Sequence, residues 1–285
     1  MAITAAMVKE LRELSGAGMM DCKKALNETN GNMDEAIEFL RKNGQAKAEK
    51  KASRIAAEGI VKVAVKDNVA AIVEVNSETD FVAKNEKFQT YVGKVAEQAL
   101  ATEAADMDAF LEEAWLEDTS KTVKDVLVEQ VAVIGENLKI RRFEKAAAQN
   151  GCIVDYIHGG GRIGVVVVAE SSIVNDTVKE AMKNIAMQIA ALNPKYIDRS
   201  EVSAEYIAHE KEILLAQIQN DPKESQKPEK VINGMIEGRV NKELKEICLV
   251  DQVYVKAEDG KQTVGKYLEA ISKEIGTEVS VSKFI

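Results

Sequence analysis

The residues best suited to a chemical or recognition role lie at 76–84, where the sequence reads Asn-Ser-Glu-Thr-Asp-Phe-Val-Ala-Lys. They follow the apolar run 69–75, whose composition is typical of a buried strand, and they precede a segment with helical spacing that begins near Glu86. An acid beside a large aromatic residue, where a strand leads into a helix, is either a structural feature of the junction or a group offered to a partner.

Both interpretations have a physical basis. Thr79 or Asp80 could cap the following helix, and Phe81 could then be its hydrophobic anchor. Alternatively, Asp80 and Phe81 could project from the junction and contact another protein. The residues themselves favour the first interpretation but do not exclude the second.

A glycine pattern further along the chain could suggest a dinucleotide site. Gly159, Gly161 and Gly164 match the GxGxxG spacing, but that motif requires a helix immediately afterwards, so that its N-terminal amides face the pyrophosphate. Here the four valines at 165–168 follow instead, and they favour a strand. The pattern therefore predicts a hairpin turn, and no cofactor is expected.

The same turn contains a histidine that could take part in catalysis. His158 and the three glycines after it are similar to the oxyanion loop of lipases, but the chain contains no GxSxG nucleophile motif. Cys152 and His158 could act as nucleophile and base, but no third orienting group is evident. We therefore expect no catalytic residue, and His158 is either an exposed residue at a strand end or a contact residue.

Composition narrows the class of protein. The chain has 285 residues, of which 46% are hydrophobic and 30% charged, as in a globular protein. None of its three cysteines forms a CxxC pair and it has only two histidines, so we expect no zinc or other metal site; reduced cysteines are typical of a cytosolic protein. The net charge of −9 argues against direct nucleic-acid binding. No run approaches the ~20 apolar residues of a membrane span, and residues 1–7 do not have the pattern of a secretory signal. We expect a cytoplasmic protein that binds other proteins and no membrane.

The N-terminal part has helical spacing. Residues 1–44 predict three short helices, with Gly44 as the C-terminal stop of the third, followed by an Ala- and Lys-rich connector at 45–54. Met19 and Met20 follow a glycine turn, where they could be core residues or an adaptable protein-binding surface.

The central part alternates between strand and helix patterns. Residues 59–75 predict a β-hairpin, and helical patterns follow at 86–102, at 107–130 and near 123–134, before a strand at 138–143. Residues 152–169 predict a second hairpin, and 175–192 a second helix. Because hairpin and helix occur twice in the same order, we expect two related α+β halves of one core.

The C-terminal part contains a pair of amphipathic helices. All three prolines fall between 194 and 228, and apolar stripes on either side of a polar loop predict an antiparallel helical hairpin. Residues 247–255 have the character of a strand, and a helix is predicted at 264–275.

Several segments resemble, in order, those of the bacterial elongation factor Ts family, the nucleotide exchange factors of elongation factor Tu. The two main segments are 15–26 (SGAGMMDCKKAL) and 71–82 (AIVEVNSETDFV). Further matches lie at 134–137 (IGEN), 158–165 (HGGGRIGV), 193–194 (NP) and 235–239 (MIEGR). The resemblance covers essentially the whole chain.

The resemblance implies an α+β fold. A three-helix module like a ubiquitin-associated (UBA) domain, with its linker, would span 1–54. Two related α+β subdomains with antiparallel sheets would span 55–145 and 146–194 plus 239–285. An antiparallel helical coiled-coil hairpin would be inserted at 195–238. A homodimer or a 2:2 complex could form through this hairpin.

The resemblance also implies a partner and a set of contacts. The loop containing Thr79, Asp80, Phe81 and Val82 would enter the GTPase beside the Mg²⁺ and phosphates of bound GDP, with Phe81 as a wedge and Asp80 repositioning a neighbouring element. Met19 and Met20, with Lys23 and Lys24, would dock the helical module on the same domain. His158 would contact a different part of the GTPase.

Two points remain open. Family members usually continue past the final strand with a Gly-Glu-Gly-containing segment and a last helix, so that contact is not carried over to a sequence that ends at Ile285. The alternative to an exchange factor is an adaptor that binds helices or peptides through its UBA-like module without promoting exchange.

Overall fold

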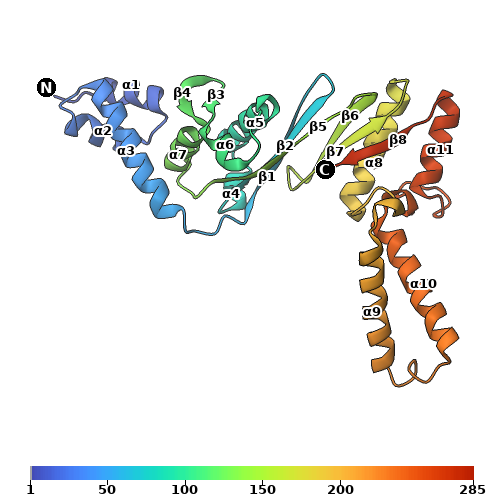
Figure 1. Ribbon diagram of the computed structural model, residues 1–285. Coiled ribbons are helices and arrows are strands. Elements are labelled where there is room, and N and C mark those ends of the chain that lie inside the picture. The colour runs from blue at the N-terminus through green and yellow to red at the C-terminus, as the bar shows by residue number, and fades with distance from the viewer. Residues whose placement is uncertain (1) are drawn as a thin grey trace. The chain divides into compact units, whose positions relative to one another are not determined.

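The computed structural model describes residues 2–285, and its elements are traced in order in Figure 1. The chain forms two compact units. The first runs to Lys66 and also contains Ala70–Lys145 and Ile157–Ile163, and the second contains Asp67–Val69, Ala146–Tyr156 and Gly164–Ile285. Helices and antiparallel strands are combined in a mixed α+β fold, as the sequence predicts.

The first unit begins with three helices, α1 (Ala5–Ser15), α2 (Met19–Glu28) and α3 (Met33–Lys51). The Thr4 hydroxyl accepts a hydrogen bond from the Met7 amide and caps α1, and Asn32 caps α3 by accepting from the Glu35 amide at 3.2 Å. Their shared core is made of small and medium-sized apolar side chains: Val8, Leu11, Cys22, Ala25, Leu26 and Ala36.

The prediction that Gly44 ends α3 is wrong, because the helix continues to Lys51. Gly44 is buried where α3 packs against α7 (Val123–Ile134), and a Cβ placed there would lie 3.5 Å from the Ala132 Cβ. Glycine therefore serves close helix packing here rather than helix termination.

The first sheet has the strand order β1-β2-β5, formed by β1 (Glu58–Lys66), β2 (Val69–Ser77) and β5 (Lys139–Ala147). The predicted hairpin is β1 and β2, joined through Asp67 in a left-handed conformation. Short helix α4 (Asp80–Ala83) and helix α5 (Glu86–Ala101) follow β2. The continuous helix predicted at 107–130 is wrong, because α6 (Met107–Glu112), β3 (Ala114–Trp115) and β4 (Asp118–Thr122) precede α7.

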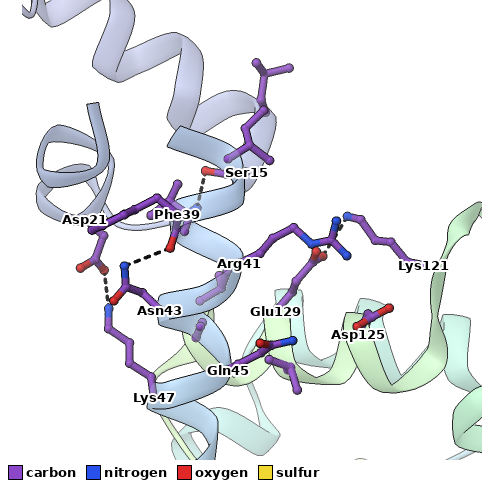
Figure 2. A pocket seen from close by; sticks show the side chains of 18 of the residues that line it. Ser15, Asp21, Phe39, Arg41, Asn43, Gln45, Lys47, Lys121, Asp125 and Glu129 are labelled. Carbon is purple, nitrogen blue, oxygen red and sulfur yellow. Dashed lines mark hydrogen bonds and ion pairs between the residues drawn. The ribbon is translucent and has the colours of Figure 1, made fainter. Parts of the chain in front are cut away.

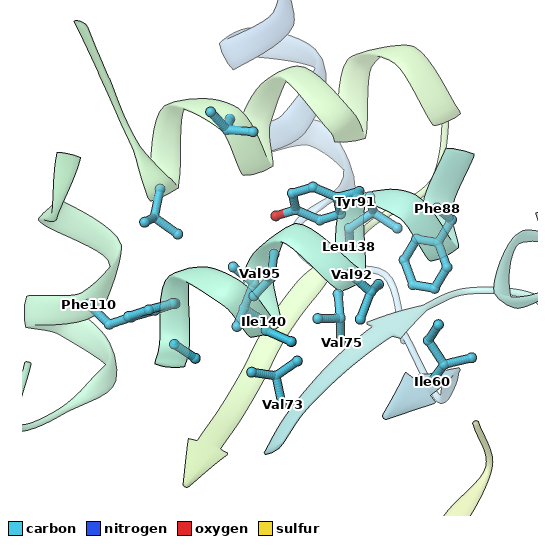
Figure 3. Close-up of a cluster of buried hydrophobic side chains, with 14 of the residues drawn as sticks. Ile60, Val73, Val75, Phe88, Tyr91, Val92, Val95, Phe110, Leu138 and Ile140 are labelled. Carbon is cyan, nitrogen blue, oxygen red and sulfur yellow. The ribbon is translucent and has the colours of Figure 1, made fainter. Parts of the chain in front are cut away.

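The core of the first unit lies between α5 and the sheet (Figure 3). Apolar residues on α5 recur at three- and four-residue spacing, which places them on one helix face. Figure 3 shows Val92 and Val95 beside Val73 and Val75 of β2, and Phe88 near Ile60 of β1. Burying each large apolar side chain stabilises the fold by about 1.5–3 kcal/mol, so this face holds α5 against the strand that leads into residues 76–84.

The second unit has a sheet of its own with the order β6-β7-β8, formed by β6 (Gly151–His158), β7 (Ile163–Glu170) and β8 (Ser280–Phe284). Strands β7 and β8 pair antiparallel, with a register shift between Val168 and Ala169. Helices α8 (Asp176–Leu192) and α11 (Val264–Ile275) pack against this sheet. The α11 bounds match the sequence prediction.

A helical hairpin is formed by α9 (Ala204–Asn220) and α10 (Glu229–Ile247), which lie side by side in Figure 1. Their shared apolar cluster includes Ile218, Ile236, Val240 and Leu244. Because the apolar spacing continues through Leu244, α10 runs past the boundary predicted at 238. The strand predicted at 247–255 is wrong: Ile247 ends α10, Leu249–Asp251 is a short 3₁₀ helix (η2), and a second, η1 (Arg199–Glu201), precedes α9.

The two sheets repeat one order of elements. In the first, the hairpin β1–β2 is followed by the long helix α5 and later by α7 and β5. In the second, the hairpin β6–β7 is followed by α8 and later by α11 and β8. The third strand pairs with the second strand of the hairpin both times. The same order of elements therefore occurs with both sheets, and the expectation that the two halves are related stays a prediction.

Candidate functional site

The segment after β2 forms a short helix that exposes its aromatic residue. The Thr79 hydroxyl caps α4 by accepting a hydrogen bond from the Val82 amide at 3.3 Å. Ala83 is buried and Val82 packs on the core of the first unit, whereas the Phe81 side chain is 81% exposed. Thr79 therefore caps α4 and not the helix expected near Glu86, because that helix, α5, is capped by Asn85. Phe81 is not an internal anchor.

A carboxylate from a distant part of the sequence holds the start of α4. The Glu136 carboxylate accepts hydrogen bonds from the Glu78 amide at 3.0 Å, the Thr79 amide at 3.1 Å and the Thr79 hydroxyl at 2.6 Å. Ser77 adds a bond from its hydroxyl to the Thr79 carbonyl at 3.1 Å. The backbone of Glu78 and Thr79, just before α4, is thus held by hydrogen bonds with both Glu136 and Ser77.

The contact is reciprocal, because the Glu78 side chain binds the segment that carries Glu136. One Glu78 carboxylate oxygen accepts from the Asn137 amide at 2.6 Å, and the same oxygen lies 3.5 Å from an Arg54 guanidinium nitrogen. The Asn137 side-chain amide donates to the Arg54 carbonyl at 2.8 Å. Three segments are thereby joined: the chain after α3, the end of β2 and the turn after α7.

Asp80 is the charged neighbour of Phe81. Its carboxylate pairs with the Lys84 ammonium at 2.7 Å, one helical turn away. The hydrogen bond and charge of Lys84 lower the pKa of Asp80 below its ordinary value, and the more distant charge of Arg162 acts in the same direction. Asp80 is therefore ionised at neutral pH while remaining at the surface.

The turn that contains His158 packs on strand β1. Gly159, Gly160 and Gly161 all have positive φ, which only glycine adopts without strain. The Gly161 carbonyl accepts from the Val61 amide at 2.8 Å, and His158, just before the glycines, is exposed. The predicted hairpin turn is confirmed in place of a dinucleotide fold. Because α4 also packs beside β1, the His158 turn and the Phe81 helix both adjoin this strand.

The remaining expected contact residues lie on α2. Met19 is 56% and Met20 75% exposed, so neither is a core residue, and Lys23 and Lys24 are also exposed. The opposite face of α2 buries Cys22, Ala25 and Leu26 against α1 and α3. The methionines therefore form a surface on a different element from α4.

A pocket of about 230 Å³ lies where the helical module meets α7 (Figure 2). Several polar side chains that line it form ion pairs or hydrogen bonds with other lining residues. Asp21 pairs with Lys47 at 2.8 Å, Lys121 with Glu129 at 3.0 Å, and the Asn43 side chain donates to the Phe39 carbonyl at 2.9 Å. In Figure 2 the Asp21–Lys47 pair joins α2 to α3 and the Lys121–Glu129 pair joins β4 to α7, whereas the Asn43 bond lies within α3. Since these polar groups are already paired, the pocket is a less suitable recognition site than the exposed loop.

Cys152, the candidate nucleophile considered from the sequence, is poorly suited to that role. Cys152 is buried, and burial raises the pKa of its thiol, which disfavours the nucleophilic thiolate. Among residues 2–285, no group of three or more His, Cys, Asp or Glu side chains is placed to hold a metal ion. In the same part of the chain, no helix combines the length and apolarity needed to cross a membrane.

Sequence reasoning missed Glu78, Glu136 and Asn137 as members of the site. Glu136 and Thr79 are 57 positions apart, so no local spacing relates them. The available signal was the segment Ile134–Asn137, which stood out as a family landmark without an assigned role.

Comparisons with known proteins identify the family. A family model described as Elongation factor TS matches residues 78–285. The chain is 48% identical to Elongation factor Ts of Clostridium tetani (strain Massachusetts / E88) over 285 residues, covering 99% of this chain and 92% of the relative. It is 50% identical to Elongation factor Ts of Clostridioides difficile (strain 630), covering 99% of this chain and 91% of the relative. The chain therefore belongs to the elongation factor Ts family of translation elongation and nucleotide exchange factors.

Proposed function

We propose that this chain binds elongation factor Tu in its GDP-bound form and promotes GDP release by inserting the loop Thr79–Val82 beside the Mg²⁺ and phosphates. The main supporting observation is that Phe81 is 81% exposed on a helix whose N-cap residue, Thr79, is held by Glu136. Large aromatic side chains are usually buried. An aromatic ring held in solvent by a fixed backbone is suited to enter a partner.

The proposed action follows from thermodynamic linkage. Bound GDP is held through its phosphates by backbone amides and by Mg²⁺. Suppose that an exchange protein binds the distorted, Mg²⁺-free site more tightly than the intact site. It then weakens the binding of GDP, and GDP weakens the binding of the exchange protein by the same ratio. Phe81 would supply this preference as a wedge, since its ring fits only where partner side chains have moved apart.

The other loop residues would assist the wedge. Asp80 is ionised and exposed, so it can interact with a polar element of the GTPase and reposition it. Thr79 sets the start of α4, and Val82 holds the helix on the core. None of these residues is assigned a catalytic role, and the factor itself would need no cofactor or metal ion.

Two further contacts would orient the factor. The exposed Met19 and Met20, with Lys23 and Lys24, would dock the helical module, which we take to be UBA-like, on the GTPase domain. His158 would contact a separate part of the GTPase from its turn on β1. The protein would act in the cytoplasm, with no direct contact to nucleic acid or membrane.

The proposal is tested by release of fluorescent GDP from elongation factor Tu. Phe81→Ala should reduce the maximal stimulated rate on the order of tenfold, equivalent to about 1.4 kcal/mol, and should weaken complex formation less. Leu116→Ala, which truncates another exposed apolar side chain of the first unit, serves as the matched control and should leave the rate unchanged.

Two results would contradict the proposal. An unchanged maximal rate with Phe81→Ala would remove the wedge role. Binding of the unmodified factor to elongation factor Tu without faster GDP release would favour the alternative, an adaptor that acts through its helical module.

A further inference from the structure

The Glu136 carboxylate receives three donors from two consecutive residues at the start of α4. Two are the backbone amides of Glu78 and Thr79, and the third is the Thr79 hydroxyl at 2.6 Å. All three bonds are partly buried, where hydrogen bonds to a charged acceptor are stronger than neutral ones. Removing this carboxylate would leave both amides without that acceptor, which is costly for partly buried groups.

The Thr79 hydroxyl relays the effect of Glu136 to the helix. The Thr79 hydroxyl donates to the Glu136 carboxylate at 2.6 Å, so its proton points towards Glu136. A lone pair of the same oxygen then faces the Val82 amide, which it caps at 3.3 Å. Glu136 therefore sets the orientation of the group that begins α4, and with it the direction in which Phe81 projects.

The reciprocal bonds keep Glu136 itself in place. Asn137, the next residue, donates its amide to Glu78 at 2.6 Å and its side chain to the Arg54 carbonyl at 2.8 Å. The Glu136 side chain thus binds the backbone of Glu78 and Thr79, and the Glu78 side chain binds the backbone of Asn137. Such an arrangement fixes position rather than merely adding contact area.

We propose that Glu136 is a positioning residue for the loop Thr79–Val82. It holds Thr79 and the start of α4 so that Phe81 has the orientation needed to enter the GTPase. This inference rests on the function proposed above. Glu136 acts through Thr79 and is assigned no contact with the partner, so its loss should change what the loop does after docking more than whether the factor docks.

Hydrogen exchange measured by NMR on the free protein tests the structural half of the inference without the GTPase. In Glu136→Ala, the amides of Glu78, Thr79 and Val82 should exchange on the order of tenfold faster or more, because their protection depends on these bonds. In Glu97→Ala, which removes an exposed carboxylate on α5, the same amides should be unchanged. Unchanged protection in Glu136→Ala would overturn the inference.

Stimulated GDP release tests the functional half. Glu136→Ala should lower the maximal rate on the order of tenfold, with a smaller change in the half-saturating concentration of factor. Glu136→Gln keeps the length of the side chain and one acceptor oxygen, so it should fall between Glu136→Ala and the unmodified protein. A loss of global stability alone would instead change the thermal midpoint and leave the maximal rate per folded molecule unaltered, and that result would overturn the inference.

A double variant separates failure of this inference from failure of the proposed function. If Glu136 acts through Phe81, Glu136→Ala combined with Phe81→Ala should be no slower than Phe81→Ala alone. Fully additive losses would overturn the positioning role while leaving the wedge in place. No loss with Phe81→Ala would contradict the proposed function, and hydrogen exchange would still decide whether Glu136 holds the loop. Should Glu136→Ala not fold, Glu136→Gln and Thr79→Val provide the same comparison.

Discussion

At the level of single residues, Asp80 and Phe81 combine an ionised group with an exposed aromatic ring on one turn of helix. The Lys84 ammonium both pairs with Asp80 and lowers its pKa. Since the pair is at the surface, its contribution to the stability of the fold is small. Asp80 is ionised at neutral pH with or without this pair, since the ordinary pKa of aspartate is already well below neutral, and Lys84 lowers it further.

Replacing Lys84 tests the origin of that pKa. In Lys84→Ala the pKa of Asp80 should rise towards its ordinary value, because the hydrogen bond and the positive charge are both lost. A folded-state pKa below the unfolded value means that the pair stabilises the fold above the ordinary pKa of aspartate. This stabilisation is lost as pH falls through the lowered value. NMR titration of the Asp80 carboxyl carbon measures the shift, and an unchanged pKa would show that Lys84 is not its cause.

At the level of elements, the turn after β6 depends on glycine for two different reasons. Gly160 needs only its positive φ, since a Cβ there would meet nothing within 4 Å. Gly161 also has a positive φ, but its Cβ would lie 2.8 Å from the Ile60 Cβ and 3.2 Å from the Val61 carbonyl. The turn can rest on β1 only if residue 161 has no side chain.

Two alanine substitutions separate these reasons. Gly160→Ala should cost about 1 kcal/mol of stability from the left-handed backbone alone. Gly161→Ala should cost about 2–4 kcal/mol, because steric overlap with β1 adds to the same strain. It should also speed hydrogen exchange at the Val61 amide, whose acceptor is the Gly161 carbonyl. Equal destabilisation by the two changes would show that the turn does not rest on β1.

At the level of the whole molecule, the helical hairpin of α9 and α10 has an apolar cluster of its own, separate from the sheet core of the second unit. Its inner face is filled by its own apolar cluster, yet Ile213, Leu215 and Val231 remain partly exposed. Exposed apolar side chains on paired helices are suited to contact with a second protein. A homodimer or a 2:2 complex with elongation factor Tu through this hairpin therefore remains our proposal.

The expected assembly can be measured by light scattering. The unmodified factor with elongation factor Tu should give the mass of a 2:2 complex, and Leu215→Ser combined with Val231→Ser should reduce it to a 1:1 complex, because the apolar contact is removed. Leu192→Ser, on α8, is the matched control for loss of an exposed apolar side chain. A 1:1 mass for the unmodified complex would show that the hairpin does not join two copies.

Elements with strong local signals could be predicted from the sequence. The bounds of α11 and the hairpin of β6 and β7 follow from apolar periodicity and glycine turns, which are properties of neighbouring residues. Predictions failed where distant packing prevailed over local preference. Gly44 has the local character of a helix stop, but contact with α7 makes it part of a longer helix.

The sequence by itself determined the family, the α+β class and the residues of the loop, because ordered motifs and local periodicity can be read along one chain. Only the tertiary structure decided that Phe81 is exposed rather than an anchor, and that Glu136 and Asn137 form hydrogen bonds with Thr79 and Glu78. The physical reason is that exposure and hydrogen bonding depend on which distant segments meet. Folding brings the turn after α7 against the end of β2, and this contact gives the loop its shape.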